Sequence, residues 1–227
     1  MTGLPLDVLE TRLSPTGADR LRAMTEEIAA DPAAIERLFP AAAREVGRGP
    51  LDSDDPTGIV GPTLDDVVRA ALLDALAQVR SVRELIDDVL ALYRYGDGDE
   101  KRAVLRSLAG LGLGAEVEPL VADALRTNDL RLVGAAMGPW AGANLDDATW
   151  RHGVLKCLFI GVPLAAVDRL AERADAELAR MVAAFGHERC AAGRDIPADS
   201  RLVLDRFEEV VARFPDVAAA LPTVPEP

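Results

Sequence analysis

Helix-start signals followed by apolar side chains at helical spacing recur along this chain, and they constrain its fold more than any other feature. Thr63-Leu-Asp-Asp66 and Ser81-Val-Arg-Glu84 each have the form of a capping box, in which a hydroxyl is followed three residues later by a carboxylate. Behind each box, apolar residues return every three or four positions, as on the buried face of a helix. No segment alternates apolar and polar residues as a half-buried strand does. The sequence therefore predicts an all-α fold.

The expected helices are short and follow one another closely. After the two capping boxes, the predicted helical segments are 99–109, 115–125, 129–137, 147–160, 163–171, 176–191 and 200–214, the last with Asp199 as its cap. Neighbouring segments joined by few residues predict antiparallel hairpins, and the glycine-rich turn 110–114 joins one such pair. Stacked hairpins are typical of a HEAT-like α-solenoid. A compact helical bundle is the alternative.

One long interruption suggests how the chain is divided. Residues 47–62, GRGPLDSDDPTGIVGP, contain four glycines and three prolines, which predict a mobile loop. We expect an N-terminal helical segment at 1–46, a helical-hairpin body at 63–214 and a frayed tail at 215–227.

Charge and hydropathy exclude several classes of protein. The 25 basic and 38 acidic residues leave a net charge of −13, which repels nucleic acid and anionic lipid. No uncharged apolar stretch is long enough to insert into a membrane, and the N-terminus lacks the basic region of a signal peptide. We therefore expect a cytoplasmic protein.

The sequence offers no recognisable metal site or cofactor motif. Cys157 and Cys190 form neither a CxxC pair nor a disulfide framework, and we expect both as reduced thiols. The acidic runs 52–55 and 97–100 lack the spacing of an EF-hand, so solvated carboxylates are expected there. P-loop, GxGxxG and GxSxG motifs are absent. We therefore expect no metal and no cofactor.

Three segments concentrate polar residues that suit the binding of an anion. Arg126 and Asn128 stand at a helix junction, where Thr127 or Asn128 is expected to cap the following helix. Lys156 lies within an apolar helix, on the same face as His152 and Phe159. The third segment supplies Glu188, Arg189 and Arg194, with Gly193 predicted to end its helix. The predicted ligand-binding residues are Arg126, Asn128, Lys156, Glu188, Arg189 and Arg194.

Taken together, these segments resemble the EboA-domain family of bacterial proteins, and the similarity runs from about residue 82 to 204. The pieces that carry it are Arg126-Thr-Asn128, Val154-Leu-Lys156-Cys-Leu-Phe159-Ile-Gly161-Val-Pro163-Leu and Glu188-Arg-Cys-Ala-Ala-Gly193-Arg194. The resemblance implies a component of an ebo-type gene cluster. Such clusters also encode a UbiA-like membrane prenyltransferase and several enzyme-like proteins, and they are linked to making or exporting a small metabolite.

Three functional hypotheses follow. The leading one is a non-catalytic helical-repeat protein that binds an anionic metabolite or a partner protein of the same cluster. The rival is an enzyme acting on a sugar phosphate or polyol, with Lys156 or His187 as base and arginines as a phosphate clamp. A buried Lys156 facing a pocket would favour the enzyme. The third is a scaffold whose acidic N-terminal half docks a basic partner.

Overall fold

A computed structural model describes residue 9 and residues 11–221, and it is helical almost throughout. The helices are α2 Pro15–Ala30, α3 Ile35–Glu45, α4 Leu64–Ala77, α5 Val82–Tyr95, α6 Gly98–Ser107, α7 Glu118–Arg126, α8 Leu130–Ala136, α9 Pro139–Asn144, α10 Asp147–Ile160, α11 Leu170–Arg173, α12 Ala176–Ala191, α13 Arg201–Leu204, α14 Glu208–Val211 and α15 Pro215–Ala220. The described residues contain no β-strand, only an isolated bridge between Pro50 and Thr63. The predicted all-α class is confirmed.

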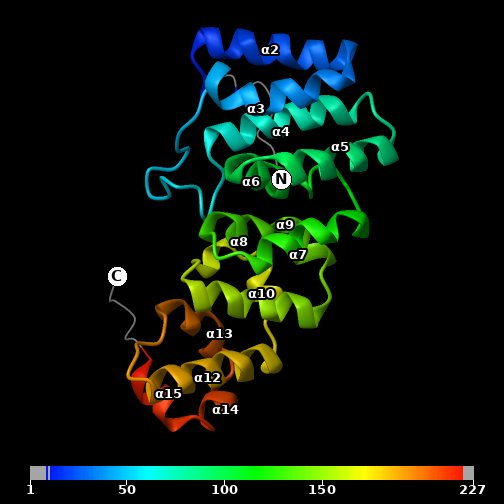
Figure 1. Cartoon of the computed structure of the whole chain (residues 1–227). Coiled ribbons are helices and arrows are strands. Elements are labelled where there is room, and N and C mark those ends of the chain that lie inside the picture. The colour runs from blue at the N-terminus through cyan, green and yellow to red at the C-terminus, as the bar shows by residue number, and fades with distance from the viewer. Residues whose placement is uncertain (1–8, 10, 222–227) are drawn as a thin grey trace.

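The helices are stacked along an elongated body, with α2 at one end and α14 and α15 at the other, and α13 is drawn between α10 and α12 (Figure 1). α4 packs most extensively against α6, and it also contacts α2, while α6 continues onto α8. A second set of helices, α3, α5 and α7, packs beside this row, on α4, α6 and α8 respectively. Buried apolar side chains from the whole stack form one core. The assignment to a HEAT-like solenoid stays a prediction.

The starts and ends of several helices agree with the capping signals in the sequence. The capping boxes at Thr63 and Ser81 are both present, and the Asp66 and Glu84 carboxylates accept the backbone N–H groups of these two caps. α10 and α12 have the predicted bounds, because an aspartate caps the start of each and a glycine with positive φ, Gly161 or Gly193, follows its end.

The pairing of helices differs from the predicted hairpins. Instead of pairing with one another across the 110–114 turn, α6 packs on α4, α5 and α8, and α7 packs on α8. The turn itself is tied to α9, since the indole Nε1 of Trp140 donates to the Leu113 carbonyl over 2.8 Å. A long-range bond of this kind is invisible to a local pattern.

Two predicted helices are broken in the structure. Segment 163–171 holds only a 3₁₀ turn before α11, and Arg169, which takes a left-handed conformation with φ 55°, stands between the two. The Leu164 N–H at the start of this turn donates to the Asp199 carboxylate over 2.6 Å. Segment 200–214 is split into α13 and α14 at Phe207, whose backbone is not helical. The predicted cap Asp199 is therefore a partner of residue 164.

The chain after residue 214 is also more ordered than the predicted frayed tail. Residues 215–220 form α15, which packs on α12. Val217 is fully buried there, against Gly186. The remainder of the expected tail, 222–227, lies outside the described residues.

The 47–62 loop is bound to the helical stack, although a mobile loop was expected. The Asp55 carboxylate accepts the N–H groups of residues 59–61 at 2.7–2.9 Å. Burial raises the pKa of Asp55, but these three hydrogen bonds outweigh it, so the pKa is lowered.

The loop is also held by two helices of the stack. The Arg106 guanidinium on α6 donates to the carbonyls of residues 58–60. A Cβ at Gly134 on α8 would lie 2.5 Å from the Ile59 carbonyl oxygen, so the loop is in direct contact with α8.

Buried charges join α4 to α6 beneath this loop. Arg102 and Asp66 are each only 2% exposed, and the guanidinium Nε lies 2.9 Å from both carboxylate oxygens. Arg102 also donates to the Thr63 hydroxyl and reaches Asp65, which pairs with Arg69 at 3.0 Å. Burial lowers the pKa of Arg102, but the hydrogen bond to Asp66 and its charge outweigh this, and the pKa is raised. The arginine therefore stays charged inside the protein.

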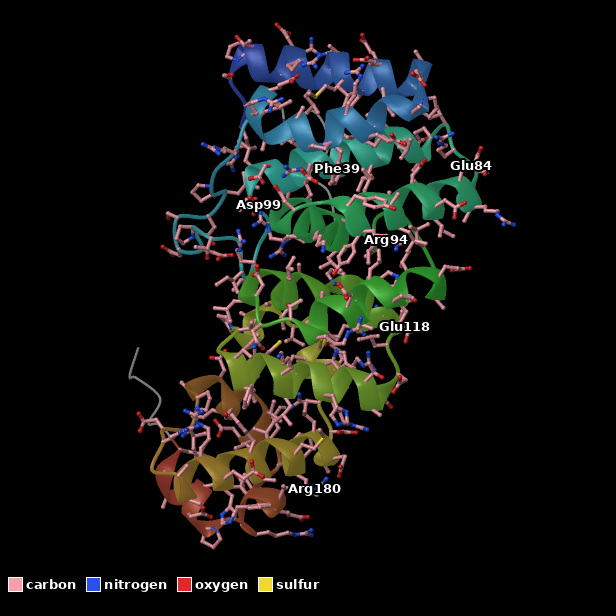
Figure 2. The ribbon with its side chains drawn as sticks, in the orientation of Figure 1. Phe39, Glu84, Arg94, Asp99, Glu118 and Arg180 are labelled. Carbon is pink, nitrogen blue, oxygen red and sulfur yellow. The ribbon has the colours of Figure 1, made fainter. Side chains whose placement is uncertain are left out.

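The network continues to the surface at the end of α6 that faces the loop, where Figure 2 labels Asp99. Asp99 accepts from Arg102 over 2.9 Å and from Arg131 of α8 over 2.8 Å. It thus links α6 to α8. Asp99 and Asp55 were expected to be solvated carboxylates, and the structure instead gives both specific partners.

Candidate functional site

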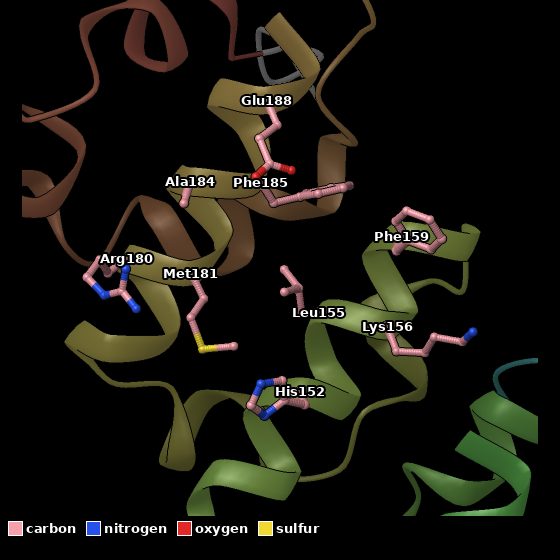
Figure 3. A pocket seen from close by; sticks show the side chains of 9 residues that line it. All are labelled: His152, Leu155, Lys156, Phe159, Arg180, Met181, Ala184, Phe185 and Glu188. Carbon is pink, nitrogen blue, oxygen red and sulfur yellow. The ribbon is translucent and has the colours of Figure 1, made fainter. Parts of the chain in front are cut away.

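An open groove of about 450 Å³ lies between α10 and α12. Figure 3 shows the side chains that line it, which are His152, Leu155, Lys156 and Phe159 from α10 and Arg180, Met181, Ala184, Phe185 and Glu188 from α12. This volume is within the usual range for a small-molecule site.

The groove exists because α10 buries the opposite side of its surface. Trp150, Val154 and Cys157 face the core, which leaves the stripe of residues 152, 155, 156 and 159 along the groove. An ion pair between Arg151 and Asp175, the cap of α12, ties the two helices together at one end. α10 and α12 pack less extensively than α4 and α6, and the unfilled space between their stripes is the groove.

The floor of the groove is apolar. Phe159 leaves 67% of its surface exposed, although its ring centroid lies only 6.4 Å from that of Phe185. Leu155 and Met181 point into the groove between the two helices (Figure 3). An exposed phenylalanine beside other apolar groups is surface that a ligand can remove from water.

The polar groups stand around this floor. The Lys156 ammonium donates to the Asn128 amide oxygen over 2.7 Å, a neutral partner that leaves its charge uncompensated. His152 Nδ1 lies 2.8 Å from the Ala148 carbonyl, so this nitrogen carries the hydrogen and Nε2 is left for other partners. Arg180 is paired with Glu177 through two hydrogen bonds, at 2.8 and 2.7 Å. The uncompensated positive charge is therefore at Lys156.

The structure brings together only some of the predicted site residues. Lys156 and Glu188 line the groove, and Asn128 joins it through Lys156. Arg189 lies outside, with its guanidinium 5.6 Å from the Phe185 ring centroid and bonded to the Asp195 carbonyl. Two others point to no common site. Arg126 pairs with Asp123 on its own helix, and Arg194 lies exposed beyond the end of α12.

Two details of the prediction are corrected by the contacts. The cap of α8 is Asp129, which accepts the N–H groups of residues 131 and 132, rather than Thr127 or Asn128. Asn128 is thereby left to bind Lys156. The apolar floor and Arg180 were not among the predicted ligand-binding residues, although the helical spacing of 152, 156 and 159 was the signal that finds this face.

His187 is turned away from the groove toward the C-terminal helices. Its Nδ1 lies 2.7 Å from the carboxylate of Asp216, and its ring is 6.2 Å from that of Phe214. Burial raises the pKa of Asp216, but the hydrogen bond with His187, the charge of His187 and backbone hydrogen bonds together outweigh it, and the pKa is lowered. His187 therefore serves to hold α15 on α12.

The two cysteines differ in environment, which predicts different reactivity. Cys157 is fully buried, and burial raises the pKa of its thiol to about 12, whereas Cys190 is only partly buried. Because the thiolate is the reactive form, we expect a disulfide reagent such as dithionitrobenzoate to modify Cys190 in the native protein and Cys157 only after unfolding. The Cys190→Ser variant should lose the native reaction and Cys157→Ser should keep it. Equal rates at both cysteines would contradict this burial pattern.

A second hollow, of about 340 Å³, lies between α3, α5 and α6. Three carboxylates, Glu36, Asp88 and Glu100, stand around it, and burial raises the pKa of Asp88 and Glu100. This acidic lining repels an anion.

Within the part of the chain that the structure describes, no group of three or more potential ligand side chains is placed to hold a metal ion. None of the described helices is both long and apolar enough to cross a membrane.

No curated protein and no solved structure matches this chain. The family model of the metabolite traffic protein EboA matches residues 61–203, from the start of α4 to α13. That stretch includes the buried charge network, Asn128 and the whole α10–α12 groove. Since the match covers most of the chain, this protein belongs to the EboA family of metabolite traffic proteins.

Proposed function

We propose that this protein binds an anionic metabolite without transforming it, and that the α10–α12 groove is the binding site. The observation that carries the proposal is an apolar groove of small-molecule size with the uncompensated ammonium of Lys156 at its edge. The family's association with metabolite traffic supports a binding role. The proposal retains the cytoplasmic location expected from the sequence.

The contacts of the two candidate bases favour binding over proton transfer. Lys156 is partly exposed and donates to the amide oxygen of Asn128, so it is not the buried lysine that the enzyme hypothesis requires. His187 is bonded to Asp216 on the other side of α12. A protein encoded in the same cluster stays the alternative partner, and it would exchange the metabolite at this groove.

Thermal unfolding with candidate ligands tests this proposal. Sugar phosphates, cyclitols and prenyl diphosphates form the panel. A compound that binds the groove should stabilise the native protein by about 2.7 kcal/mol when present at 100 times its dissociation constant. Lys156→Ala should abolish this stabilisation because it removes the uncompensated charge.

Lys101 provides a matched control, since it is the other lysine of the chain and stands over the Tyr93 ring, at 5.2 Å, far from the groove helices in sequence. Lys101→Ala should keep the full ligand-induced shift. A shift that survives Lys156→Ala, or a panel in which no compound raises the melting temperature, contradicts an anion site at this groove.

A further inference from the structure

We propose that the ligand of the α10–α12 groove is an amphiphilic anion, whose apolar body lies against Phe159 and Phe185 and whose charged end stays at Lys156. This inference rests on the proposed function of the groove and names the chemical class of its ligand. It follows from how apolar and polar groups are distributed along the two facing helices.

The apolar part of the groove calls for an apolar ligand body. Leu155 and Phe159 on α10 face Met181 and Phe185 on α12, with no polar side chain of the lining between the two rings in Figure 3. A polyol or sugar placed on this floor would lose hydrogen bonds to water without replacing them, which is unfavourable. An alkyl chain or aromatic ring has no hydrogen bonds to water to lose there, and it covers the exposed surface of Phe159.

The charges favour an anion at the edge of the groove. Lys156 extends along the outer side of α10, away from Arg180 (Figure 3), so its ammonium stands beyond the apolar floor. A phosphate or carboxylate held there keeps part of its hydration while its apolar body lies in the groove. Glu188, the one carboxylate of the lining, comes from near the Phe185 end of the α12 stripe. A negative group is therefore repelled from that end and attracted to the Lys156 edge.

Isothermal titration with four simple probes tests the class of ligand. The probes are octyl phosphate, glycerol 3-phosphate, octylammonium and inorganic phosphate, each used below any micelle-forming concentration. We expect octyl phosphate to bind at least about tenfold more tightly than the other three, because it alone combines an apolar chain with a phosphate.

Two variants locate the binding. Phe159→Ala should weaken octyl phosphate binding about tenfold or more, and its exposed position means that the fold is retained. Tyr95→Ala is the matched control, because Tyr95 is an 81% exposed aromatic residue on α5, outside the groove, and its loss should leave binding unchanged.

The outcomes separate this inference from the proposed function. Equal binding of glycerol 3-phosphate and octyl phosphate, abolished by Lys156→Ala, would overturn the amphiphile and keep the anion site. Equal binding of octylammonium and octyl phosphate would overturn the anionic head. Failure of all four probes, together with no response to the wider metabolite panel, would overturn the inference and the proposed function together.

Discussion

The Arg102→Met variant should lose about 3–5 kcal/mol of its free energy of unfolding, the cost of leaving a buried charge without its partner. Arg102 contacts both Asp66 and Asp65 at the α4–α6 contact. Its removal leaves Asp66 with the longer 3.6 Å contact to the Arg106 Nε, while Asp65 keeps Arg69. Arg102→Lys should fall between the wild type and Arg102→Met, because an ammonium keeps the charge and cannot reproduce the forked hydrogen bonds. Urea unfolding measured by circular dichroism gives these free energies.

Arg126→Ala is the control for removing an arginine from this chain. Its guanidinium pairs with Asp123 on the surface, where such a pair is worth less than about 1 kcal/mol. The free energy of unfolding of Arg126→Ala should therefore lie within about 0.5 kcal/mol of the wild-type value. If Arg102→Met is as stable as this control, the buried charges do not hold α6 on α4.

Gly134→Ala should lower the free energy of unfolding by about 1–3 kcal/mol, even though alanine is the better helix former. The added methyl group would lie 2.5 Å from the Ile59 carbonyl oxygen, and this backbone atom is fixed by Arg106. The loop must then leave α8, so limited proteolysis should cut the variant faster within residues 47–62.

Gly98→Ala is the matched glycine substitution. Gly98 begins α6, and the nearest atom to an added Cβ is the end of the flexible Arg131 side chain at 3.6 Å. The variant should keep wild-type stability and the wild-type rate of loop cleavage. A Gly134→Ala protein that matches Gly98→Ala in both measurements would show that the loop does not rest on α8.

Local chemistry explains why some helices were predictable and others were not. The bounds of α10 and α12 follow from an aspartate cap and a terminal glycine, signals that act within a few residues. The breaks at Arg169 and Phe207 lie inside continuous apolar patterns, and in the same region the bond from the Leu164 N–H to Asp199 joins residues that are far apart in sequence. A periodic pattern continues through such breaks because it contains no information about hydrogen bonds made across the fold.

The candidate site was half predictable for a related reason. Lys156 and Glu188 stood out as charges near apolar helix residues, and both line the groove. The sequence did not distinguish these two residues from three arginines that lie elsewhere. Arg126 pairs with Asp123 on its own helix, Arg189 lies over the Phe185 ring, and Arg194 follows the end of α12. The burial of Arg102 was not predicted. An arginine three residues after an aspartate, as Arg102 is after Asp99, has the spacing of an ordinary exposed ion pair on a helix. Only the tertiary structure shows that Arg102 is buried, that Arg189 is partly buried and that Arg126 and Arg194 are exposed.

The anchored loop has a consequence for how the protein opens. Helices that touch only their neighbours can detach one layer at a time from an end of a stack. Residues 58–60, held by α6 and pressed on α8, connect these two layers, so we expect α6 and α8 to lose their structure in one step. The helices from α12 onward meet α10 and the turn that follows it at the groove, at the Arg151–Asp175 pair and through the bond from the Leu164 N–H to Asp199. A molecule bound in the groove adds to the contacts that hold α12 on α10, and we therefore expect it to raise the free energy needed to detach the C-terminal helices.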